Sequence, residues 1–167
     1  MIDADEVLND RLRAELLAAD DGVEGYTVSR TTYFRGKPLR AWTGERLLRL
    51  FRTNRAHLEA APAAGGDADL HERWVCDGAV GALQGTLEHY SYPDTESYRE
   101  KYARYTDIEA RGLHASTAGA LLQSLLVPLR FTRTLLRGAA LDGPDGWYVA
   151  WYSALYPAVV QWKALRS

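Results

Sequence analysis

The stretch that decides the fold is Gly25-Tyr-Thr-Val-Ser-Arg-Thr-Thr-Tyr-Phe34. It is rich in β-branched and aromatic residues, which suit the pleated surface of a sheet, and it therefore predicts a strand. Gly36-Lys-Pro38 follows as a turn, and residues 46–52 predict a second strand with interleaved arginines. Residues 84–92 predict a further strand and residues 73–76 a short one. We expect these segments to form a mixed sheet.

Helices are expected before and after these strands in the sequence. Leucines recur at helical spacing between residues 8 and 17, behind a cluster of acids that suits a helix start. Beyond Pro93 we expect a tyrosine-bearing helix, then a helix over residues 115–137 that is kinked near Pro128, and then a loop over residues 138–146. The fold class is therefore α/β, a few strands of a mixed sheet followed by two or three helices.

Composition, net charge and the cysteine count exclude several classes of protein. The chain has 167 residues, of which 47% are hydrophobic and 25% charged, as in ordinary globular domains. The net charge of −2 argues against a nucleic-acid partner. Cys76 is the single cysteine, which excludes an internal disulfide and a cysteine-rich zinc module. We expect a reducing, cytoplasmic compartment.

Charge is distributed in blocks along the chain. Residues 1–24 contain eight acids and two arginines, a net charge of −6, whereas residues 25–57 contain eight basic residues and one acid, a net charge of +7. Such blocks create local fields although they cancel in the total. They are typical either of solvated surface or of an acidic edge for a cation beside a basic surface for an anion.

Asp3-Ala-Asp5 is a pair of carboxylates that we interpret as lying at a strand end. Such a pair holds a divalent cation when substrate phosphates complete the coordination. The spacing alone is uninformative, because Asp67-Ala-Asp69 repeats it. Context favours the first pair, which precedes Glu6 and an amphipathic helix, whereas the second lies in a glycine- and alanine-rich loop.

Six motifs occur in an order that resembles a known family. They are Ile2-Asp-Ala-Asp-Glu6, Gly25-Tyr-Thr-Val-Ser-Arg30, Tyr33-Phe-Arg-Gly36, Arg46-Leu-Leu-Arg-Leu-Phe-Arg52, Leu70-His-Glu72 and His89-Tyr-Ser-Tyr92. The series is similar to the C-terminal half of family-2 glycosyltransferases of the lipopolysaccharide-core type, and the match runs from Ile2 to about the end of the chain. The resemblance implies a partial GT-A domain over residues 1–92 and an amphipathic, membrane-proximal helical extension over residues 93–167.

The resemblance also implies a reaction and a set of site residues. A sugar would pass from a nucleotide-diphosphate sugar to a saccharide or lipid-linked acceptor with inversion, assisted by Mg²⁺ or Mn²⁺ on Asp3 and Asp5. Glu72 would be the general base, with His71 beside it on the acceptor face. The expected substrate-binding residues are Arg46, Arg49, Arg52 and His89, since arginine binds phosphate bidentately.

Enzymes of this type carry a Rossmann-like nucleotide-binding half before the Asp-x-Asp pair, a region of roughly 80–100 residues at the usual size of a βαβ unit. Only two residues precede Asp3 in this sequence. We therefore expect transfer by the chain alone to be absent or very weak, and we expect the chain either to self-associate or to need a separate nucleotide-binding chain. Two alternatives stay open, a split glycosyltransferase and a non-catalytic membrane-surface or assembly module.

The C-terminal region indicates contact with a membrane. Residues 112–141 contain three arginines and no acid, and the leucines of this region form one helical face, a pattern typical of an interfacial helix on anionic lipid. The charge-free segment over residues 146–162 is at the lower limit of a membrane span. We expect peripheral attachment at the inner face of the cell membrane, with internal packing of both helices as the alternative.

Overall fold

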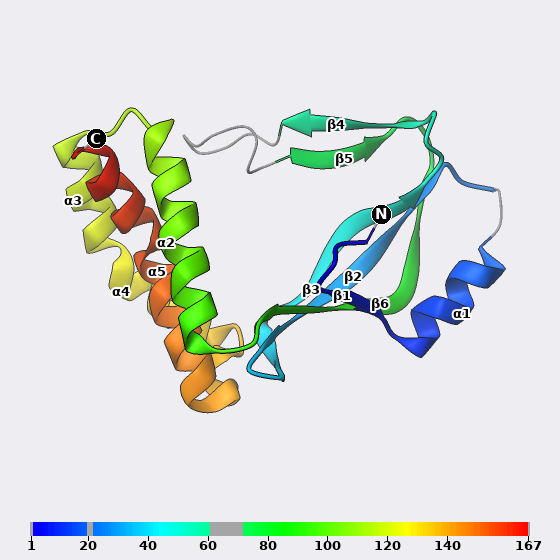
Figure 1. Cartoon of the computed structure of the whole chain (residues 1–167), viewed down its shortest axis with the longest axis horizontal. Coiled ribbons are helices and arrows are strands. Elements are labelled where there is room, and N and C mark those ends of the chain that lie inside the picture. The colour runs from blue at the N-terminus through cyan, green and yellow to red at the C-terminus, as the bar shows by residue number, and fades with distance from the viewer. Residues whose placement is uncertain (1, 20–21, 61–71, 167) are drawn as a thin grey trace. The chain divides into compact units, whose positions relative to one another are not determined.

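The computed structural model describes residues 2–19, 22–60 and 72–166. These residues belong to two compact units, with the boundary between Pro93 and Asp94. The first unit is built around a sheet, and the second consists of helices (Figure 1). A mixed sheet followed by C-terminal helices is the architecture expected from the sequence, and the structure confirms this coarse prediction.

Four strands form the sheet of the first unit. They are β1 (Glu6–Leu8), β2 (Gly25–Phe34), β3 (Lys37–Phe51) and β6 (Val80–Tyr92), in the order β1-β6-β2-β3. β2 and β6 run parallel, whereas β1 pairs antiparallel with β6 and β3 pairs antiparallel with β2. The long β6 thus lies between the N-terminal segment and the predicted strand β2.

Helix α1 (Asp10–Ala18) covers this sheet through Leu12, which packs in a buried cluster with Val28, Leu83 and Leu87. Asn9 begins the helix by accepting a hydrogen bond from the Leu12 N–H at 2.8 Å. The Glu15 carboxylate accepts hydrogen bonds from the backbone N–H groups of Gln84 and Gly85. The Gly85 N–H in particular holds the pKa of Glu15 below its ordinary value.

Strands β4 (Ala56–Ala60) and β5 (Glu72–Cys76) form a separate antiparallel pair in the first unit. The Trp74 ring stacks on Phe51 at the end of β3, with 4.7 Å between ring centroids. This contact connects the two-stranded pair to the main sheet. The expected strand at residues 73–76 is confirmed by β5.

The second unit packs its helices around α5 (Gly143–Ala164), which buries mainly small residues. Its other members are α2 (Thr95–Arg111), α3 (Thr117–Leu125), α4 (Val127–Leu136) and the 3-10 helix η2 (Ala139–Asp142). Tyr98 and Tyr102 of α2 pack edge-on against Tyr152 of α5 at 5.6 and 5.0 Å. Burial raises the pKa of Tyr102 to about 12.

Three local predictions were wrong. The single helix expected over residues 115–137 is two helices that meet at Leu126, because Pro128 lies in the first turn of α4, where its missing N–H costs no hydrogen bond. The loop expected over residues 138–146 contains η2 and the first turn of α5. Asp3 and Asp5 do not end a strand; they precede β1, which begins at Glu6.

Helix length and hydropathy bear on the expected membrane contact. None of the helices in the described part of the chain is long and apolar enough to cross a bilayer.

Candidate functional site

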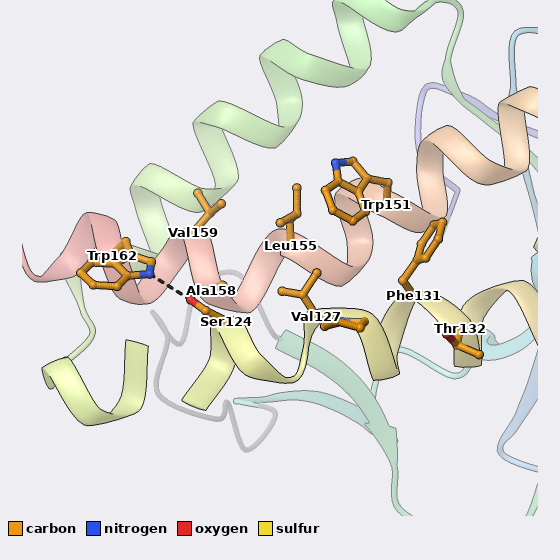
Figure 2. A pocket seen from close by; sticks show the side chains of 10 residues that line it. Ser124, Val127, Phe131, Thr132, Trp151, Leu155, Ala158, Val159 and Trp162 are labelled. Carbon is orange, nitrogen blue, oxygen red and sulfur yellow. Dashed lines mark hydrogen bonds between the residues drawn. The ribbon is translucent and has the colours of Figure 1, made fainter. Parts of the chain in front are cut away.

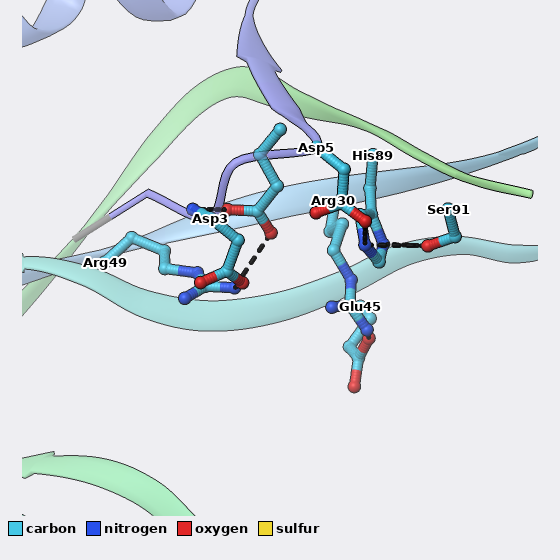
Figure 3. Close-up of polar contacts among 8 residues, drawn as sticks. Asp3, Asp5, Arg30, Glu45, Arg49, His89 and Ser91 are labelled. Carbon is cyan, nitrogen blue, oxygen red and sulfur yellow. Dashed lines mark hydrogen bonds and ion pairs between the residues drawn. The ribbon is translucent and has the colours of Figure 1, made fainter. Parts of the chain in front are cut away.

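The N-terminal segment lies beside strand β6 and brings its acids to the sheet. The Tyr90 N–H donates to the carbonyl of Asp5 at 2.8 Å, and Glu6 pairs with His89 in the register of β1 and β6. A turn precedes the strand, since the Glu6 N–H donates to the Asp3 carbonyl at 3.1 Å. Asp3 and Glu6 are thereby held next to Arg49 of β3, and Asp5 next to His89 of β6. Figure 3 shows Asp3 beside Arg49 and Asp5 beside His89.

Arg49 of β3 joins two of these acids. Its Nη2 lies 2.8 Å from Oε1 of Glu6 and 3.0 Å from Oδ2 of Asp3. The Glu6 side chain is 0% exposed and that of Arg49 is 12% exposed, whereas that of Asp3 is 49% exposed. Glu6 also accepts a hydrogen bond from the Asp3 N–H. Arg49 thus pairs with a buried carboxylate and orients an accessible one.

His89 of β6 holds the second accessible acid. Its Nε2 lies 3.2 Å from Oδ2 of Asp5, whose side chain is 39% exposed. The ring also contacts the hydroxyl of the buried Ser91, so the three side chains form a row (Figure 3). Burial lowers the pKa of His89, and the nearby Asp5 carboxylate opposes this effect.

Arg30 of β2 adds a positive charge next to His89, and this charge also lowers the pKa of the histidine. Arg30 forms an ion pair with Glu45 of β3 (Figure 3). Acids and bases from four strands therefore meet at this place. The resulting field is mixed in sign, unlike the separate acidic and basic blocks along the sequence.

Arg46 and Arg52 have partners within the protein. The Arg46 guanidinium donates to the carbonyls of Thr27 and Leu83 at 3.1 and 2.8 Å, which ties β3 to the backbones of β2 and β6. Arg52 lies 3.5 Å from Glu24, in a partly exposed pair. Arg46 therefore stabilises the sheet, and phosphate binding by these two arginines stays a prediction.

The expected catalytic pair is only partly described. Glu72 is the first residue of β5, and its backbone pairs with that of Ala60. His71, Asp67 and Asp69 lie outside the described residues. The general-base role of Glu72 and the acceptor contact of His71 stay predictions.

The donor set at Asp3 and Asp5 fits a hard divalent cation. No group of three or more histidine, cysteine or acidic side chains that could hold a metal occurs among residues 2–19, 22–60 and 72–166. Mg²⁺, however, is usually bound by one or two carboxylates, with waters and substrate phosphates as its other ligands. Two accessible carboxylates on one short segment meet that requirement.

Sequence reasoning did not single out Glu6, Arg30 or Ser91 as site residues. Glu6 occurs in the quoted Asp-Ala-Asp-Glu motif, and Ser91 occurs in His89-Tyr-Ser-Tyr92, so both had a local signal. Arg30 ends the quoted Gly25-Tyr-Thr-Val-Ser-Arg30 motif, but its approach to His89 depends on the parallel pairing of β2 with β6, which local sequence does not show. That pairing places Thr32 opposite His89. Arg30 lies two residues before Thr32, so its side chain is on the same face of β2 as that of Thr32.

No protein-family model, curated protein or solved structure matches this chain. The geometry around Asp3 and Asp5 and the order of the sequence motifs are therefore the observations on which a function is proposed.

Proposed function

We propose that this chain is part of a glycosyltransferase of the GT-A type. The enzyme moves a sugar from a nucleotide-diphosphate sugar to a saccharide or lipid-linked acceptor, in envelope polysaccharide or glycolipid synthesis, with inversion at the anomeric carbon. The observation that carries the proposal is the pair Asp3 and Asp5, two accessible carboxylates that Arg49 and His89 hold on one segment. The order of the six sequence motifs gives further support.

In this proposal Asp3 and Asp5 would hold Mg²⁺ or Mn²⁺, and the ion would supply positive charge to a leaving diphosphate. Arg49 positions Asp3 from β3, and His89 positions Asp5 from β6. The two carboxylates then need little reorganisation when a diphosphate arrives, which is the advantage of a preorganised polar site. Arg49 and Arg52 contribute positive charge beside the diphosphate.

The acceptor side of the proposed reaction involves β5. Glu72 takes the proton from the acceptor hydroxyl as that oxygen attacks the anomeric carbon and the bond to the diphosphate breaks. His71 contacts the acceptor. As the resemblance implies, base and ribose are held by a Rossmann-like nucleotide-binding half, in this protein or in a separate chain.

We expect Asp5→Asn to weaken the binding of Mn²⁺ together with inorganic pyrophosphate by about tenfold or more, because a charged oxygen ligand is lost. Pyrophosphate is the probe because it presents the diphosphate without requiring a pocket for base or ribose. Isothermal titration of the whole chain with Mn²⁺, at fixed pyrophosphate, measures the effect.

The matched control is Asp77→Asn, the same change at a carboxylate that is exposed and pairs with His57 away from Asp3 and Asp5. It should bind Mn²⁺ and pyrophosphate like the unchanged chain. Equal losses in the two variants, or no binding by the unchanged chain, would remove the metal from the proposal.

Glu72→Gln tests the general base. In the enzyme completed by its nucleotide-binding half, we expect kcat to fall by roughly 10²–10⁴-fold, the usual contribution of a base, with donor affinity unchanged. Steady-state kinetics against donor concentration separates the two quantities. Glu59→Gln, on the neighbouring strand β4 and paired with Arg73, serves as the control. An unchanged kcat for Glu72→Gln excludes this residue as the base.

A further inference from the structure

The second unit exposes an unusual number of large apolar side chains. Leu125 and Leu136 are 77% and 83% exposed, and they belong to a group that we call the leucine face. Its members are Leu121, Leu122, Leu125, Leu129, Leu136 and Leu141. Isolated exposed leucines are normal on proteins, whereas a group of this kind marks an interaction surface.

Helical spacing shows how the leucine face is arranged. On α3, Leu121, Leu122 and Leu125 lie within one helical face, and on α4 Leu129 and Leu136 are seven residues apart and share a face. Arg133 lies between these two leucines on the same side of α4 and is exposed, as is Arg137. One exposed face of α4 therefore combines apolar leucines with a positively charged arginine.

An apolar groove is formed by other residues of α3 and α4 together with α5 (Figure 2). Its volume is about 480 Å³, and none of its lining residues is charged. Phe131 of α4 and Trp151 of α5 meet edge-on at 5.6 Å in its wall. At the other end, the Trp162 indole N–H donates to the Ser124 hydroxyl at 3.0 Å. The groove offers space for an apolar chain, and the indole N–H of Trp162 already has its hydrogen-bond acceptor in Ser124.

Charge decides which partner suits this surface. Residues 112–141 contain three arginines and no acid. A second copy of the chain on a two-fold axis would bring the same patch against itself and would oppose Arg133 and Arg137 with their own equivalents. An anionic lipid surface offers the opposite charge together with an apolar interior. Trp147, Trp151 and Trp162 are partly exposed on α5, and indole rings favour the headgroup level of a bilayer.

We propose that the leucine face docks on an anionic lipid bilayer and that the groove takes up part of an acyl chain. The leucines of α3, α4 and η2 enter the acyl boundary, and Arg133 and Arg137 contact lipid phosphates, as in interfacial amphipathic helices. The cytoplasmic leaflet is the anionic one, which agrees with attachment at the inner face of the membrane. This inference does not depend on the proposed sugar transfer.

Co-sedimentation of the whole chain with vesicles tests the proposal. We expect binding to phosphatidylcholine vesicles that contain about one third phosphatidylglycerol, little binding to pure phosphatidylcholine, and loss of binding as salt rises. The double variant Arg133→Gln/Arg137→Gln should bind roughly 25-fold more weakly, given about fivefold per basic residue near the surface. The variant Leu129→Gln/Leu136→Gln should also bind more weakly at low salt.

The control is Arg13→Gln/Arg40→Gln, which makes the same change in net charge at exposed arginines of the first unit. It should bind vesicles like the unchanged chain, and equal loss in both double variants would overturn the proposal. Circular dichroism establishes that each variant is folded. Absence of lipid binding by the folded chain at low salt also overturns it, as does a dimer that becomes monomeric in the leucine variant without any lipid binding.

Acyl chains brominated along their length report on the groove. Two of the five tryptophans, Trp151 and Trp162, line it, so bound vesicles with brominated chains should quench part of the tryptophan fluorescence. Vesicle binding without quenching would show that the chain attaches through lipid headgroups alone. It would overturn the proposal that the leucines enter the acyl boundary and that the groove takes up an acyl chain.

Discussion

Replacement of Gly85 by alanine is expected to lower the free energy of unfolding by roughly 1–3 kcal/mol, the usual range for overpacking a filled core. An alanine Cβ at this position would lie 2.3 Å from both Cα and N of Leu12 and 2.5 Å from its Cβ. Backbone atoms of α1 cannot turn away as a flexible side chain can, so the helix must shift on the sheet. That shift would also disturb the buried cluster of Leu12 with Val28, Leu83 and Leu87.

Urea unfolding measures the loss, and hydrogen exchange shows whether it is located in α1 and β6. Gln84→Ala is the matched control, because Gln84 is the exposed neighbour of Gly85 on the same strand. We expect it to change stability by less than about 0.5 kcal/mol, as surface substitutions usually do. Similar losses in the two variants, or none in Gly85→Ala, would mean that α1 does not pack on β6 as described.

Replacement of Arg49 by methionine is expected to cost about 3–5 kcal/mol, because it leaves a buried carboxylate without its opposite charge. Glu6 is 0% exposed in its side chain, and Arg49 lies 2.8 Å from it with only 12% exposure, so solvent screens this pair little. The accessible Asp3 loses the same partner. The variant should therefore lose both stability and affinity for Mn²⁺ with pyrophosphate.

A double-mutant cycle separates the pair from other effects of Arg49. Glu6→Leu in the Arg49→Met background removes the buried charge, and buried ion pairs replaced by apolar residues often regain stability. We expect the double variant to be more stable than Arg49→Met alone, while its affinity for Mn²⁺ stays low because Asp3 is no longer held. A double variant that is no more stable than the single one would contradict the buried-pair assignment.

Short-range patterns determined many of the elements. The β-branched and aromatic residues of 25–34 predicted β2, and the leucine spacing between residues 8 and 17 predicted α1. Pro128 was misinterpreted because a proline inside an apolar run either kinks a helix or begins one, and local sequence does not distinguish the two. Here Pro128 lies in the first turn of α4, and the break falls at Leu126.

The site depended on contacts that are distant in sequence. Asp3, Asp5, Arg49 and His89 were each singled out from local motifs, yet their pairing into Arg49 with Asp3 and His89 with Asp5 was not. Asp3 and Arg49 are 46 positions apart in the sequence, and Arg49 lies on β3, at the opposite edge of the sheet from β1, so only the folded sheet brings their side chains together. Arg46 comes from the same arginine-bearing motif as Arg49, yet its guanidinium donates to backbone carbonyls of β2 and β6.

The sequence by itself determined β2, α1 and a helical C-terminal region, the acids near the N-terminus and the basic, acid-free leucine pattern of residues 112–141. These properties follow from side-chain shape, periodicity and charge, which act over a few residues. The tertiary structure alone decided that Glu6 is buried against Arg49, that His89 holds Asp5, and that a groove opens between α5 and the helices α3 and α4. The physical reason is that burial and ion pairing depend on strand order and helix packing, which bring together residues far apart in the chain.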